Sequence, residues 1–136
     1  DVAYGAFEFW TQKYMGQIKL PLTIKVPARG VRIAILRKAS PAPQILATDR
    51  HIAQSGFEFK SAKFDSSKNS LEGTISLVEN FPLKMFVSIP KGYSFDRVES
   101  TAEASAEVAD GVAAITFKGK DSSKNSDCDF KVFFKK

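Results

Sequence analysis

The triplet Asp49-Arg50-His51 is the densest group of side chains in this sequence that could do chemistry. It holds the only histidine and has apolar stretches on both sides. Because imidazole titrates near neutral pH, His51 could act as a base assisted by Asp49 and Arg50, or contact a sugar. The alternative is a partly buried imidazole that fixes the path of the chain between two strands. We favour this structural role because the groups that usually accompany a catalytic histidine are missing.

Other catalytic and metal-binding patterns are absent from the sequence. There is no Gly-x-Ser-x-Gly motif, and the glycines form no phosphate-binding loop. The single Cys128 lies between Asp127 and Asp129, whose negative charges disfavour a reactive thiolate. With one cysteine and one histidine, a zinc site would need mainly carboxylate ligands, so we expect none. We therefore expect no catalytic residue, no metal and no cofactor, and a chain that is not an enzyme. A small stand-alone enzyme using His51 is the remaining catalytic alternative.

Aromatic side chains are the second group with recognisable chemistry. Tyr4, Trp10, Tyr14 and Tyr93 could stack on sugar rings, whose apolar faces suit aromatic platforms. In a chain with twelve Phe, an aromatic more often belongs to a core or to a domain interface. Trp10 has the opposite parity to Phe7 and Phe9, so we expect it to leave the core face and to contact something outside the domain.

Charge and hydropathy restrict the class of partner. The net charge is +5, but Lys and Arg are spread along the chain and the nearest approach to a basic run is Lys135-Lys136. We therefore expect no nucleic-acid binding, which usually uses basic residues gathered on one face. No apolar run approaches the roughly 18 residues of a membrane span, so we expect no membrane insertion. The sequence starts at Asp1 without a leader, as in a processed or excised protein, and we favour a periplasmic or extracellular location over the cytoplasm.

The elements that must position these residues are strands. Apolar and polar residues alternate with a period of two, and no window supports an amphipathic helix. The expected strands are residues 6–10, 18–20, 22–26, 31–37, 57–64, 71–77, 83–89, 112–117 and 128–134, with residues 100–110 as a further strand or an irregular segment. Pro21 should break the chain between two short strands, and a change of parity predicts a bulge near Ser61 and Ala62.

Turn signals separate these strands. The hexapeptide Asp-Ser-Ser-Lys-Asn-Ser occurs twice, at residues 65–70 and 121–126. Asp and Ser bond their own backbone in turns, and Asn tolerates positive φ, so we expect both hexapeptides to be hairpin tips. The second would join residues 112–117 to residues 128–134. Pro90-Lys91-Gly92 is expected to form a type I turn with Gly in fourth position.

About nine or ten short strands at this spacing predict an all-β fold, an antiparallel β-sandwich, with a β-barrel as the alternative. No linker-like segment divides residues 1–136, so we expect one domain.

Two blocks of the sequence resemble a known family. Residues 4–10, YGAFEFW, followed by Tyr14-Met15-Gly16, resemble the start of the C-terminal domain of α-galactosidase-like (melibiase-type) glycoside hydrolases. Residues 43–56, PQILATDRHIAQSG, are similar to a second signature of that domain, and residues 71–73 and 89–93 resemble two later ones. The likeness covers roughly residues 1–95. Glu8 and Ala47 stand where the family has Asp and Ser.

The resemblance implies a non-catalytic C-terminal accessory β-sandwich that packs on a catalytic (β/α)8 barrel and stabilises it. Such a barrel needs at least about 200 residues and is therefore not in this chain. The contact would involve Trp10, Tyr14, Arg50 and His51. The first alternative is a carbohydrate-binding module with Trp10, Tyr14 or Tyr93 as platforms.

Overall fold

The computed structural model describes residues 2–50, 57–78, 80–119 and 126–136, and these parts of the chain form strands and no helix. His51 lies outside the described residues. The strands are β1 Ala3–Glu8, β2 Lys13–Lys19, β3 Ala34–Lys38, β4 Gln44–Thr48, β5 Phe59–Asp65, β6 Ser70–Leu77, β7 Leu83–Ser88, β8 Ser94–Ser100, β9 Glu103–Ala109, β10 Val112–Lys118 and β11 Ser126–Lys135.

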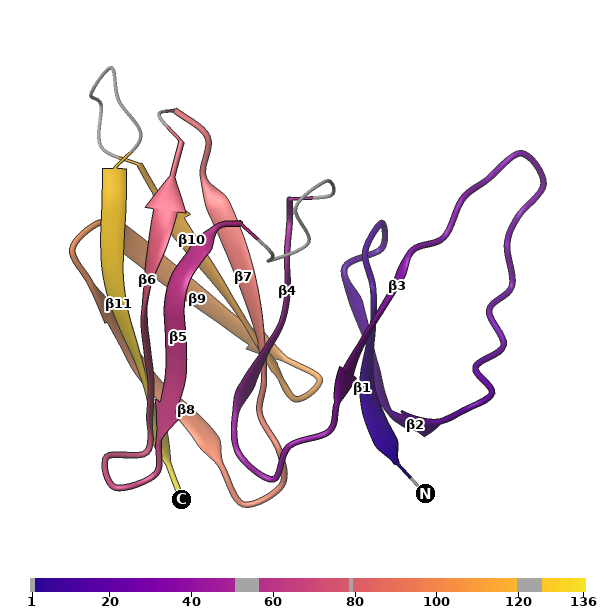
Figure 1. Cartoon of the computed structure of the whole chain (residues 1–136), viewed down its shortest axis with the longest axis horizontal. Coiled ribbons are helices and arrows are strands. Elements are labelled where there is room, and N and C mark those ends of the chain that lie inside the picture. The colour runs from indigo at the N-terminus through magenta and orange to yellow at the C-terminus, as the bar shows by residue number, and fades with distance from the viewer. Residues whose placement is uncertain (1, 51–56, 79, 120–125) are drawn as a thin grey trace.

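The strands form three antiparallel sheets (Figure 1). Sheet A has the order β2-β1-β3, sheet B the order β4-β7-β10-β9, and sheet C the order β5-β6-β11-β8. Among the described residues no sheet closes on itself, so the barrel alternative is wrong and the sandwich is confirmed. The segment expected as a strand or an irregular stretch contains strand β9.

Sheets B and C enclose the main core. Alternation along β7 and β10 directs Met85 and Ile115 of sheet B towards Ile75 and Phe130 of sheet C, and all four are fully buried. The ring of Phe117 lies 5.8 Å from that of Phe130 across the same interface. Two sheets that each bury one face against the other form a β-sandwich.

Sheet A covers the opposite face of sheet B. Phe7 of β1 packs on Phe86 of β7 with ring centroids 4.6 Å apart, and Leu46 and Val112 complete a second, smaller apolar cluster. Gly5 allows this close approach, because a Cβ there would lie 3.2 Å from Leu46 Cδ2. The molecule therefore has three layers in the order C, B, A, with sheet A and the long β2–β3 connection on the outside (Figure 1).

Two predicted elements differ in the structure. Residues 22–26 have strand-like alternation but form no strand, because the chain after the cis Leu20–Pro21 bond runs away from sheet A as an open connection. Strand β3 begins at Ala34, three residues later than the alternation indicates. Alternation reports which face a residue would show, but a strand also needs a neighbour to bond.

The two identical hexapeptides connect strands in different ways, and residues 121–125 of the second copy lie outside the described residues. The first is the β5–β6 hairpin tip, as predicted: Asp65 Oδ1 accepts from Ser67 N at 2.9 Å, and Asn69 has a φ of 50°. The hairpin prediction for the second is wrong. Strand β10 pairs with β7 and β9 in sheet B, whereas β11 pairs with β6 and β8 in sheet C, so the chain crosses between the sheets there.

Of two smaller predictions, the bulge in β5 is confirmed and the turn after β7 is of another type. The predicted bulge is present as a register shift between Phe59 and Ser61. The turn after β7 is displaced by one residue: Tyr93 N donates to Pro90 O at 3.0 Å, and Gly92, with a φ of 94°, holds the third position. Positive φ in third position is typical of a type II turn rather than type I.

Candidate functional site

The β1–β2 turn positions Trp10, and buried Glu8 organises that turn. Glu8 Oε2 accepts from Thr11 N at 2.8 Å and from Thr11 Oγ1 at 2.6 Å. Glu8 Oε1 accepts from Trp10 N and Ile33 N, both at 3.3 Å. Burial acts to raise the pKa of Glu8, but the hydrogen bonds from Thr11, Ile33 and Trp10 outweigh it and hold the pKa below its ordinary value. An ionised carboxylate thus fixes the turn from within.

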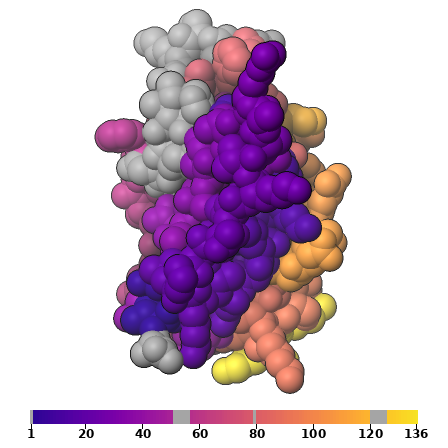
Figure 2. All heavy atoms as spheres, turned by 90° about the vertical axis from the view of Figure 1, so that its right-hand side faces the viewer, coloured from indigo at the N-terminus to yellow at the C-terminus, as the bar shows by residue number. Residues whose placement is uncertain are grey.

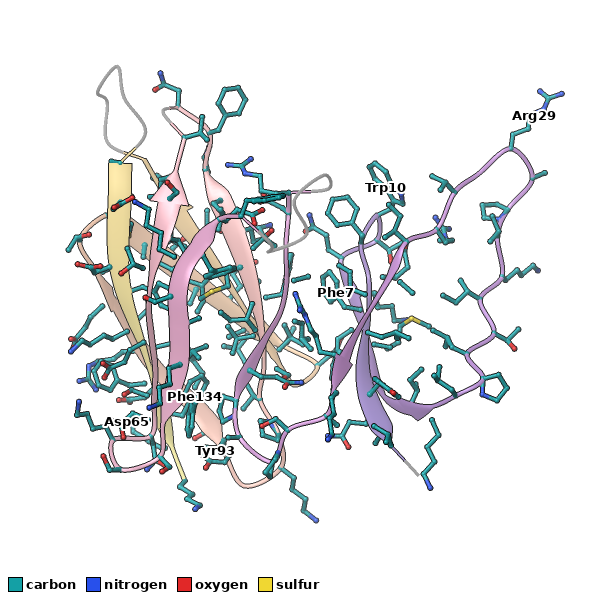
Figure 3. All side chains as sticks on the ribbon, in the orientation of Figure 1. Phe7, Trp10, Arg29, Asp65, Tyr93 and Phe134 are labelled. Carbon is teal, nitrogen blue, oxygen red and sulfur yellow. The ribbon has the colours of Figure 1, made fainter. Side chains whose placement is uncertain are left out.

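Trp10 itself points to solvent, as its parity predicts. Its side chain is 49% exposed and meets the ring of Phe9 edge-on at 5.0 Å, while Phe7 and Phe9 are buried. Glu8, which shares the parity of Trp10, is buried instead, because the chain at Ile33 closes over it. The turn therefore presents one large aromatic face at the end of sheet A (Figure 3).

Asp49 and Arg50 tie the end of β4 to the β6–β7 connection. Arg50 Nη2 donates to the carbonyls of Phe81 and Pro82 at 2.9 and 3.2 Å. Asp49 N donates to Lys84 O at 3.0 Å, and Asp49 Oδ1 accepts from Lys84 N at 3.1 Å. Below them, Thr48 Oγ1 donates to the buried Glu58 Oε1 at 3.0 Å. The bonds of Asp49 and Arg50 go to backbone groups, and the bond between Thr48 and Glu58 is buried. All of them therefore stabilise the fold rather than present polar groups to a ligand.

Several connections between strands lie at the end of the molecule where β1, β4 and β6 finish (Figure 1), and three of them carry an exposed aromatic residue. Phe81, in the connection that Arg50 holds, is 62% exposed, and Phe57, just before β5, is 85% exposed. Trp10 occupies the same end on sheet A (Figure 3). We call Trp10, Phe57 and Phe81 the aromatic end. The sequence pattern pointed to Trp10 but not to Phe57 or Phe81; the signal for Phe81 is a large aromatic residue placed between Asn80 and Pro82, in a turn.

Tyr14 lies in a groove between the β1–β2 hairpin and the β9–β10 hairpin. The groove has a volume of about 330 Å³, and Phe86 forms part of its wall. Gln12, Glu107 and Asp110 supply polar groups along it. The Tyr14 side chain is half-buried beside Gly5, and this burial raises the pKa of its phenol. The groove thus combines an aromatic ring with hydrogen-bonding side chains.

Tyr93 lies at the opposite end of the molecule from Trp10 (Figure 3). Its ring meets Phe64 edge-on at 5.9 Å and Phe134 at 6.5 Å, and Lys136 Nζ lies 5.8 Å from its centre. The structure therefore brings Trp10 and the Arg50 region to one end, places Tyr14 in a neighbouring groove, and separates Tyr93 from all of them.

The described residues contain no group of three or more His, Cys, Asp or Glu side chains arranged to hold a metal ion. None of the described segments is a helix of the length and hydropathy needed to cross a bilayer.

Comparison with known proteins identifies no relative: the chain matches no protein-family model, no curated protein and no solved structure.

Proposed function

We propose that this chain is a non-catalytic accessory domain of an α-galactosidase-like glycoside hydrolase, which packs through its aromatic end on the catalytic (β/α)8 barrel of the same polypeptide. The likeness of residues 4–16 and 43–56 to that family's C-terminal domain supports the identity of the partner. The observation that carries the proposal is the aromatic end itself, where Trp10, Phe57 and Phe81 face solvent.

Burial of these rings supplies the driving force for packing. Removing an exposed aromatic side chain from water contributes roughly 1.5–3 kcal/mol. The backbones that carry Trp10 and Phe81 are also fixed before any partner arrives, at Trp10 N by Glu8 and at Phe81 O by Arg50. A preformed surface loses little conformational entropy on association.

The test is an association measurement between this chain and the barrel domain produced separately from the same gene. We expect binding that Trp10→Ala and Phe81→Ala each weaken at least tenfold, as for central aromatic residues of an interface. Val108→Ala is the matched control, because Val108 is half exposed on β9, away from the aromatic end. A gene that encodes no barrel, or turnover of an aryl α-galactoside by these 136 residues that His51→Ala abolishes, would contradict the proposal.

A second candidate function is carbohydrate binding in the Tyr14 groove. The observation that favours it is the combination of the Tyr14 ring with Gln12, Glu107 and Asp110 in one recess. Titration calorimetry against a panel of neutral oligosaccharides should then show binding that Glu107→Gln and Asp110→Asn weaken together. Trp10→Ala should leave it unchanged, because Trp10 does not line the groove. Absence of binding to every glycan excludes this function.

A further inference from the structure

The net positive charge of this protein comes from its N-terminal part. Residues 1–48 contain seven Lys and Arg and two Asp and Glu, which gives all of the net charge of +5. Residues 49–136 contain 13 basic and 13 acidic residues and are neutral. From residue 9 to residue 48 there is no acidic residue. The boundary coincides with the structure, since residues 1–48 comprise sheet A, the β2–β3 connection and β4.

Cations in the two parts of the fold have different partners. In sheets B and C, Lys60 pairs with Asp127 at 2.6 Å, and Lys118 pairs with Glu103 at 2.7 Å. On sheet A and its β2–β3 connection, no described carboxylate lies within 4.0 Å of Lys13, Lys25, Arg29, Arg32 or Lys38. Glu8 makes no ion pair with these five cations, and its two oxygens accept from Thr11, Trp10 and Ile33.

Apolar side chains alternate with these cations along the β2–β3 connection. Leu20, Val26 and Val31 are each more than half exposed. The connection stands away from sheet A, with Arg29 at its tip (Figures 1 and 3). A backbone bond from Gly30 N to Pro27 O at 3.0 Å, together with a φ of 57° at Arg29, closes that tip as a turn. We call residues 20–33 the basic-apolar segment. Viewed from the side that carries sheet A and the β2–β3 connection, the N-terminal residues cover much of the surface from top to bottom (Figure 2).

We propose that the basic-apolar segment docks this protein on an anionic lipid surface. Cations next to exposed aliphatic side chains match the boundary between headgroups and acyl chains, where charge attraction and apolar burial act together. A segment docked in this way lies at the surface of the lipid bilayer and does not cross it.

The composition of the segment distinguishes a lipid surface from a nucleic acid. Single-stranded nucleic acids are held by aromatic side chains that stack on bases, and residues 19–33 contain no aromatic residue. Duplexes are held through phosphate contacts, to which exposed Val26 and Val31 add nothing. A lipid surface is the partner that uses both kinds of side chain.

The test is sedimentation of the 136-residue chain with vesicles of phosphatidylcholine and phosphatidylglycerol, and with vesicles of phosphatidylcholine alone. We expect binding to the anionic vesicles only, weakening as salt increases. The triple variant Lys25→Gln/Arg29→Gln/Arg32→Gln should lose about 100-fold in affinity, because each basic residue near such a surface contributes about fivefold. The control Lys60→Gln/Lys118→Gln/Lys131→Gln removes the same charge from paired cations of sheets B and C and should lose less than about threefold.

The aliphatic side chains provide an independent measurement. Val26→Ser/Val31→Ser keeps every charge and should weaken binding to anionic vesicles severalfold, while leaving retention on a sulfated-polysaccharide column unchanged. Absence of binding to anionic vesicles at low salt would overturn the proposal. So would an equal loss in the control triple variant, which means dependence on net charge alone, or unaltered vesicle binding of the valine variant, which means a general polyanion site. These variants leave the aromatic end intact, so association with a barrel domain is measured separately.

Discussion

Sheets B and C bury their apolar faces against each other, whereas sheet A and its β2–β3 connection leave charged and aliphatic side chains exposed. Between B and C, fully buried residues such as Met85, Ile115 and Phe130 pack in a continuous core, and surface lysines pair with carboxylates. Sheet A buries a small cluster around Phe7 against sheet B, and its β2–β3 connection carries exposed aliphatic residues and cations, Lys25, Arg29 and Arg32, that have no described carboxylate within 4.0 Å. The comparison indicates that the B–C sandwich is the stable body of the protein, and that sheet A with its β2–β3 connection has the smaller core and the more exposed aliphatic surface.

The core substitutions should separate the two regions most strongly. Phe130→Ala removes a buried ring between sheets B and C and should lower the free energy of unfolding by about 3–5 kcal/mol. Phe7→Ala removes the ring that joins sheet A to Phe86 and should cost about 3 kcal/mol. Chemical denaturation measures both values. Hydrogen exchange should show that Phe7→Ala removes protection in β1–β3 while β6, β7, β10 and β11 keep theirs.

The control for this experiment is Leu36→Ala on the outer side of sheet A, which should cost less than about 1 kcal/mol. If Phe7→Ala lowers protection in sheets B and C as much as in sheet A, the sandwich is not independent of its third layer.

Glu8 should give sheet A a pH dependence of its own. Its folded pKa lies below the ordinary value of 4.5, so its contribution to stability is fully present above that pH and is lost as the pH falls through the folded pKa. Glu8→Gln places an amide against the donors of the β1–β2 turn and should cost about 2 kcal/mol at neutral pH. Fluorescence of Trp10, the only tryptophan, follows the turn.

The matched change in the sandwich is Asp65→Asn, because the hydroxyl and N–H of Ser67 hold the pKa of Asp65 at about 2. The stabilisation from Asp65 is likewise lost as the pH falls towards that value, but it should not alter Trp10 fluorescence. An acid transition of Trp10 that persists in Glu8→Gln would show that another group controls the turn.

Surface charge substitutions should have the smallest effects. Lys60→Gln breaks the pair with Asp127 and should lower stability by less than about 1 kcal/mol, an effect that added salt reduces. Lys25→Gln should raise the free energy of unfolding by less than about 0.5 kcal/mol, because it relieves repulsion among the cations of the basic-apolar segment. Thermal unfolding at low and high salt measures both. A clear loss of stability in Lys25→Gln would mean that Lys25 has a stabilising contact within the fold.

The fold class followed from the alternation of side chains, but the pairing of strands did not. Residues 71–77 and 83–89 alternate and became β6 and β7, whereas residues 22–26 alternate equally well and form no strand. The same limit applies to the repeated hexapeptide. Its first copy is a hairpin tip, and its second lies where the chain passes from β10 in sheet B to β11 in sheet C. The same six residues therefore leave both outcomes open, because packing of distant strands decides which sheet the chain enters next.

The candidate site was likewise predicted only in part from the sequence. Parity alone predicted that Trp10 faces outward, and the aromatic residue does so because the turn after β1 is fixed by Glu8. Phe57 and Phe81 could not be assigned to that end from the sequence, since they lie far apart along the chain and only the topology puts their connections at the same end. The function assigned to this end remains a proposal that rests on the family resemblance and on exposure.

By itself, the sequence determined that this protein is an antiparallel β-sandwich with an outward Trp10 and a net charge of +5. These properties depend on neighbouring residues or on composition, which a chain carries whatever its fold. Tertiary structure alone decided that sheet A forms a third layer, that Asp49 and Arg50 anchor the chain at the β6–β7 connection and the start of β7, and that no described carboxylate lies within 4.0 Å of Lys25, Arg29 or Arg32. Each of these depends on which distant segments pack together, because burial and pairing are properties of contacts rather than of sequence position.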